Sequence, residues 1–102
     1  MQVLNYDITA QVPLGERHGR LHLEEQDGVC TGEMELMRFH NAVSGTIGRD
    51  GTCCLKGMLK TLVREYAFTA QGICGEKDAD LTFQWGRLHV HVQGERTVES
   101  HV

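Results

Sequence analysis

The sequence predicts an all-β protein, built as a single small antiparallel up-and-down β-barrel of about eight strands. Three observations lead to this fold class. Apolar and polar residues alternate along most of the chain, turn residues recur at short intervals, and glycines fall singly on strand faces predicted to point inward. A β-sandwich is the alternative architecture, because it shares the alternation and the spacing.

Length and composition indicate one globular domain. The chain has 102 residues, of which 40% are hydrophobic and 24% charged, and such values are typical of one domain with one core. We expect a single barrel domain over residues 1–102, with a loosely ordered polar tail from about Gly94. The net charge of −4 argues against nucleic-acid binding, which needs clustered Lys and Arg.

The sequence also argues against a membrane or secreted location. No apolar run approaches the ~18–20 residues that span a bilayer, and residues 1–7 lack a basic start and an apolar signal core. We therefore expect a cytoplasmic protein without a membrane partner. In that compartment Cys30, Cys53, Cys54 and Cys74 are expected to be free and mostly buried thiols.

Alternation identifies the strands of the first half of the chain. Residues 4–12 form the first strand, and a turn region follows from Pro13 to Gly19. A second strand over residues 20–24 leads into Asp27-Gly28, a strong hairpin signal. Residues 30–36 alternate again. We interpret residues 39–42 as a loop before a short strand at 43–47.

The second half repeats this organisation. Turns at residues 49–51 and 75–78 and at Gly86 separate alternating segments at 53–61, 66–74, 81–85 and 88–92. One segment is ambiguous, because Met58, Leu62 and Tyr66 also fit the apolar stripe of a helix. The alternation on either side favours strand.

Glycines on inward faces favour a barrel over an open sheet. Gly32, Gly57 and Gly72 fall on the inward side of their strands, where a missing side chain lets a strand coil sharply. Closure also removes exposed edge strands.

Several motifs together resemble a known architecture. They are Pro13-Leu14-Gly15, the segment from Gly19 to Leu23, the segment from Ser44 to Gly51, and the segment from Leu55 to Thr61. The pattern resembles small bacterial antiparallel β-barrel domains and is broadly similar to calycin or streptavidin-like barrels. Because calycins often bind small apolar ligands, the resemblance implies a pocket, and it transfers no catalytic residue.

Histidines form the best candidate metal site. His89 and His91 are two apart on a strand, so both imidazoles project to one side and could bind one Zn²⁺ or Cu²⁺. His22 occupies the matching place in a similar strand and is the candidate third ligand. An exposed polar strand face that happens to use histidine is the alternative explanation.

Other side chains give weaker candidates for chemistry. Glu33 and Glu35 are paired carboxylates on an outer face, where Lys56 and Lys60 across the sheet are their expected partners. Cys30 or Cys74 would need a histidine neighbour to act as a nucleophile, and no signature places one there.

Aromatic and exposed apolar residues suggest binding. Tyr6, Phe68, Phe83 and Trp85 share the inward face and line or fill the interior. The outer-face residues Met37, Met58 and Leu62 predict a homodimer or a protein partner.

The sequence thus predicts a non-enzymatic binding module that holds a small apolar ligand or a protein partner, without a cofactor. The alternative is a metal-dependent enzyme or metal-binding protein that uses the strand histidines.

Overall fold

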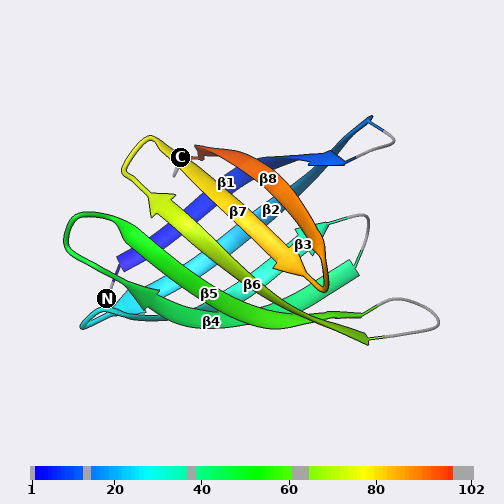
Figure 1. Cartoon of the computed structure of the whole chain (residues 1–102). Coiled ribbons are helices and arrows are strands. Elements are labelled where there is room, and N and C mark those ends of the chain that lie inside the picture. Colours follow the sequence, from blue (N-terminus) through cyan, green and yellow to red (C-terminus); the bar gives the residue numbers. More distant parts are fainter. Residues whose placement is uncertain (1, 13–14, 37–38, 61–64, 98–102) are drawn as a thin grey trace.

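Eight antiparallel strands close into an up-and-down barrel, in which each strand lies beside the next in chain order (Figure 1). The computed structural model describes residues 2–12, 15–36, 39–60 and 65–97. The strands are β1 (Gln2–Val12), β2 (Gly15–Gln26), β3 (Val29–Leu36), β4 (Phe39–Ile47), β5 (Thr52–Lys60), β6 (Glu65–Cys74), β7 (Asp78–Trp85) and β8 (Leu88–Arg96). The predicted fold class is confirmed, and the described part of 58–66 is strand.

The hairpin at Asp27-Gly28 forms as its sequence predicts. Asp27 has φ 54° and Gly28 has φ 83°, the left-handed pair that a tight two-residue hairpin turn requires. This turn fixes the register of β2 against β3, from Gln26 opposite Val29 to Gly19 opposite Leu36.

The first turn is shorter than the sequence suggests. The predicted turn region of 13–19 is wrong beyond residue 14, because β2 begins at Gly15 and pairs with β1 along its whole first half. Its first four residues have no partner on β3 and therefore bury no consistent face. Without a buried face these residues show no alternation, and the sequence signal for a strand is lost.

The predicted loop at 39–42 is also wrong, because β4 begins at Phe39. Asn41 takes an inward position in this strand and is only 2% exposed. A polar residue on the buried face interrupts the apolar alternation that marks a strand.

The interior is a single cluster of apolar side chains contributed by every strand. Its members are Leu4, Tyr6, Ile8, Ala10, Leu21, Leu23, Cys30, Met34, Leu36, Val43, Cys53, Leu55, Phe68, Ala70, Cys74, Ala79, Leu81, Phe83, Val90 and Val92. Glycines let neighbouring strands approach closely around it: a Cβ at Gly32 would collide with the carbonyl oxygen of His22, and one at Gly72 with that of Asp80.

The last strand extends past the position where the sequence predicts a loose tail. Gly94 is buried within β8, the Arg96 amide donates to the carbonyl of Lys77 at 2.8 Å, and the Thr97 amide donates to that of Asn5 at 2.9 Å. The rest of the predicted tail, residues 98–102, lies outside the described residues. In the described chain, no helix has the length and apolarity to cross a membrane.

One ladder of the barrel is short although both of its strands continue. β4 and β5 pair only from Val43 opposite Gly57 to Ile47 opposite Cys53. Beyond Val43 and Gly57, residues 39–42 of β4 remain paired with β3, and residues 58–60 of β5 remain paired with β6. The β5–β6 hairpin therefore separates from β4, and this separation shapes the outer surface there.

Candidate binding site on the outer face of β3 to β6

The aromatic residues predicted to line or fill the interior are packed within it. Tyr6, Phe68 and Phe83 are between 1% and 3% exposed. The rings of Phe68 and Phe83 stack with centroids 5.4 Å apart, and the Tyr6 hydroxyl donates to the Gly75 carbonyl at 2.7 Å. The side chain of Trp85 is outside the described part of the chain. These three rings contribute to the core and leave the outside of the barrel as the place for a ligand.

The candidate histidine ligands do not converge. His89 and His91 share the outer face of β8, but His22 lies on β2, on the far side of β1. His22 is opposite Asn5 and His91 is opposite Gln11, positions roughly 20 Å apart along a strand. In the described ranges, no three His, Cys, Asp or Glu side chains form a metal-binding group.

Two of the three candidate histidines, His91 and His22, each contact polar side chains nearby. His91 Nε2 lies 2.6 Å from a carboxylate oxygen of Asp80. His22 Nδ1 lies 2.5 Å from the side-chain oxygen of Asn5, and its Nε2 lies 3.8 Å from Glu24. The contacts with Asp80 and Asn5 join neighbouring strands, and the contact with Glu24 is within β2, so all three are local contacts on the outer surface.

The predicted partners of the paired carboxylates are wrong. Glu33 lies opposite His22 and Ala42, and Glu35 lies opposite Arg20 and His40. Lys56 cannot face either carboxylate across a ladder, because β4 lies between β3 and β5. Its own cross-strand neighbours are Ser44 and Thr69.

The cysteines are free, and all but Cys54 are buried, as predicted. Burial raises the pKa of Cys30 to about 11. A hydrogen bond with Cys74, together with burial, raises the pKa of the Cys53 thiol. The same hydrogen bond lowers the pKa of Cys74, while burial acts in the opposite direction. Of the two candidate nucleophiles, burial thus clearly disfavours the thiolate at Cys30.

Two adjoining hollows lie on the outer face of β3 to β6, and the larger has a volume of about 870 Å³. Its floor is the cross-strand row Gly32, Val43, Gly57 and Phe68. Its far wall is formed by exposed small or apolar side chains at the point where β4 and β5 separate. They are Ala42, Met58 and Ala67, with His40 and Asn41 beside them.

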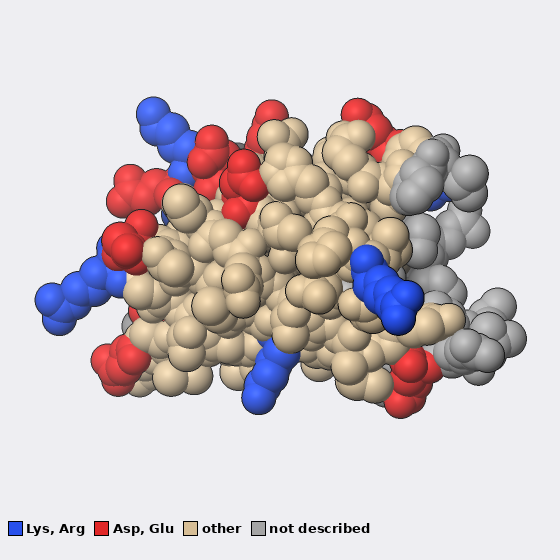
Figure 2. Space-filling view, viewed as in Figure 1, with Lys and Arg blue, Asp and Glu red and all other residues tan. Residues whose placement is uncertain are grey.

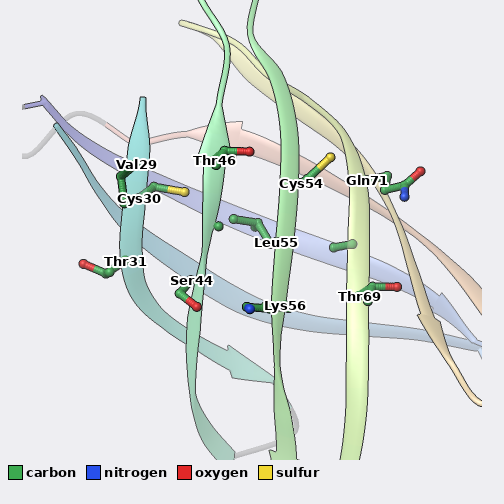
Figure 3. A pocket seen from close by; sticks show the side chains of 12 residues that line it. Val29, Cys30, Thr31, Ser44, Thr46, Cys54, Leu55, Lys56, Thr69 and Gln71 are labelled. Atoms are coloured by element: carbon green, nitrogen blue, oxygen red, sulfur yellow. The ribbon is translucent and has the colours of Figure 1, made fainter. Parts of the chain in front are cut away.

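The smaller hollow, of about 530 Å³, lies directly beside it (Figure 3). The backbone of the row Cys30, Gly45, Leu55 and Ala70 crosses its floor. Its outer wall is the row of side chains Val29, Thr46, Cys54 and Gln71. Two of the four, Thr46 and Gln71, offer uncharged hydrogen-bonding groups in this wall.

A single row of side chains separates the two hollows and lines both. We call it the hydroxyl–lysine ridge, and it consists of Thr31, Ser44, Lys56 and Thr69, one from each of β3 to β6. Lys56 is the one Lys, Arg, Asp or Glu among the described residues that line either hollow. Figure 2 shows a face of the barrel that is largely free of charge, with charged side chains mainly toward its margins.

Sequence reasoning identified only part of this site. Phe68 was predicted as a ligand-binding residue and forms part of the floor, and Met58 was predicted to be exposed and is 39% exposed. Met37 and Leu62, the other members of the predicted patch, lie outside the described residues. The missed signal is the run of small uncharged residues at outward positions of β4 to β6, such as Ala42, Ser44 and Ala67.

Comparison with protein-family models, with curated proteins and with solved structures finds no match to this chain.

Proposed function

We propose that this barrel is a non-enzymatic binding module that holds a small apolar ligand in the larger hollow. The observation that carries the proposal is the hollow itself: about 870 Å³, with a wall of exposed Ala42, Met58 and Ala67 over a floor that includes Val43 and Phe68. Ligand sites are typically concave, of ~300–1,000 Å³, and mostly apolar with a few polar groups that orient the ligand.

The packing of the interior supports an external site. Calycin-like barrels, which the sequence resembles, suggest a ligand inside the barrel. Here large side chains such as Tyr6, Phe83 and Leu21 are almost fully buried among their neighbours, and a barrel of eight strands can be filled by its side chains. The outer hollow needs no repacking of the core to admit a ligand.

The strands that form the floor of the larger hollow pack closely around Gly57. Gly57 lies opposite Val43 on one side and Phe68 on the other. A Cβ at Gly57 would lie 2.5 Å from the Ala42 carbonyl oxygen and 2.8 Å from Phe68 Cζ. Glycine at this position therefore lets the Ala42 backbone and the Phe68 ring pack closely beneath the floor of the hollow.

Titration with the neutral fluorescent probe N-phenyl-1-naphthylamine tests this proposal. Its emission rises when it enters an apolar site. Met58→Glu and Ala67→Glu place a carboxylate in the wall, which the probe would have to desolvate, so we expect each to weaken binding about tenfold or more. Both residues are exposed, so the fold should persist, which far-UV circular dichroism checks.

Ile73→Glu is the matched control. Ile73 is an apolar residue on β6 that is 55% exposed and does not line either hollow. This variant should bind the probe as the parent does. Absence of probe binding to the parent, or an equal loss in Ile73→Glu, would contradict the proposed site.

A further inference from the structure

We infer that the ligand is amphipathic: its apolar part fills the larger hollow, and an anionic head group binds Lys56 on the hydroxyl–lysine ridge. This inference rests on the proposed function and specifies its substrate class. The head group is an anion with oxygen acceptors, such as a carboxylate or a phosphate monoester.

The register places two hydroxyl donors beside the lysine. Lys56 lies directly opposite Ser44 on β4 and directly opposite Thr69 on β6, so all three side chains leave the same face of the sheet in one row. Side chains directly opposite each other have Cβ atoms about 4.5–5.5 Å apart. An ammonium flanked by two hydroxyls at that spacing can donate several hydrogen bonds to one anionic oxygen group.

The charge around the ridge is complementary to an anion. Although the chain carries a net charge of −4, no described residue that lines either hollow is Asp or Glu. Lys56 also has no ion-pair partner within 4.0 Å among the residues that the structure describes. Its positive charge is thus available to a ligand.

The position of Lys56 matches the two parts of such a ligand. The lysine is on the wall that the two hollows share, and Figure 3 shows it among the side chains that line the smaller hollow. On one side of it lie the apolar groups around Met58 and Phe68, and on the other lie the polar side chains of Thr46 and Gln71. The apolar chain would therefore lie against the Met58 side, and the head group would lie at the ridge, with Thr46 and Gln71 beyond it.

Isothermal titration calorimetry with decanoate, decyl phosphate and decanol, each below its micelle-forming concentration, tests the inference. The three ligands share a chain length and differ in the head group. In low salt, we expect decanoate to bind the parent about tenfold more tightly than decanol, because the ammonium adds a charge-assisted hydrogen bond. Lys56→Met, which keeps the apolar stem, should remove that advantage and leave decanol binding within about twofold of the parent.

Two further variants separate charge from packing. Lys56→Arg should retain the preference for decanoate, because it restores the positive charge. Lys77→Met removes a lysine from the turn between β6 and β7, away from both hollows, and should leave all affinities unchanged. Equal loss for decanoate and decyl phosphate in Lys56→Met supports a general site for anionic oxygen groups, and loss for decanoate alone supports a carboxylate site.

The outcomes distinguish this inference from the function on which it rests. If decanol and decanoate bind the parent equally, or if Lys56→Met weakens both to the same extent, the anionic head group is wrong and the apolar site stands. If none of the three ligands binds and the naphthylamine probe does not bind, both proposals are wrong.

Discussion

Tyr6 joins the core of the barrel to its rim. Its ring is 1% exposed, while its hydroxyl donates to the carbonyl of Gly75 in the turn between β6 and β7. Burial, followed by the nearby Cys74 thiol, raises the pKa of Tyr6 from 10.0 to about 12. The folded protein therefore holds this proton at a pH where an unfolded chain releases it.

The raised pKa predicts a loss of stability in base. Between pH 10 and pH 12 the folded state binds more protons than the unfolded state, so rising pH favours unfolding. Two pKa units correspond to about 2–3 kcal/mol. We expect Tyr6→Phe to lose correspondingly less unfolding free energy over this interval, as measured by urea denaturation at each pH. At pH 7 the variant should be about 1 kcal/mol less stable, because the hydrogen bond to Gly75 is lost.

Tyr66→Phe provides the matched control. Tyr66 is 39% exposed, and its hydroxyl has no hydrogen bond recorded among the described residues. Its unfolding free energy should follow that of the parent at every pH. A Tyr6→Phe variant that loses stability in base as steeply as the parent would contradict the assignment of this loss to Tyr6.

Single residues were predictable where one rule of alternation applied. Inward positions such as Leu4, Tyr6 and Ile8 were identified because polar residues separate them. Asn41 was missed because a buried polar residue cannot be distinguished from an exposed one in sequence. The predicted partners of Lys56 were wrong because cross-strand neighbours depend on the order of the strands in the barrel. The alternation of side chains along one strand does not reveal that order.

At the scale of elements, Gly57 helps to set the geometry at the point where β4 separates from the β5–β6 hairpin. Gly57 is the last β5 residue paired with β4, and the Ala42 carbonyl oxygen and the Phe68 ring crowd the space where its side chain would be. Close packing on both sides leaves no room for a larger residue.

Gly57→Val should therefore destabilise the barrel by about 1–3 kcal/mol or more, through overpacking and displacement of the Phe68 ring. Urea denaturation followed by circular dichroism measures this. Gly48→Ala is the comparison, because the added Cβ meets only a side-chain carboxylate oxygen of Asp50 within 3.4 Å and no backbone atom, and we expect a smaller loss. A stable Gly57→Val variant would show that this glycine is not closely packed.

Most strands and turns were predictable because each has a local signal, such as the alternation of 4–12 or the Asp27-Gly28 turn. The candidate site was less predictable. Its walls are cross-strand rows that join four strands, and the register that aligns Thr31 with Ser44, Lys56 and Thr69 is set by three successive hairpins together. The sequence contains these residues, but only the fold places them in one row.

At the scale of the whole molecule, one apolar cluster receives side chains from every strand. Such a core should be lost as a unit, because removing one strand exposes the side chains of its neighbours. We expect urea unfolding to be a single transition, with the same midpoint by far-UV circular dichroism and by NMR signals of core methyl groups. Two separate midpoints would indicate independently folding parts and would contradict a single domain.

The closing ladder between β1 and β8 has a consequence for folding. Every other ladder joins consecutive strands, whereas this one brings Tyr6 opposite Arg96 from the two ends of the chain. Until it forms, the chain is an open sheet whose first and last strands each present an unpaired backbone edge, and such edges recruit other chains. Pairing of an open edge with another chain requires two molecules, whereas closure of the barrel requires only one. The yield of refolded monomer should therefore fall as protein concentration rises.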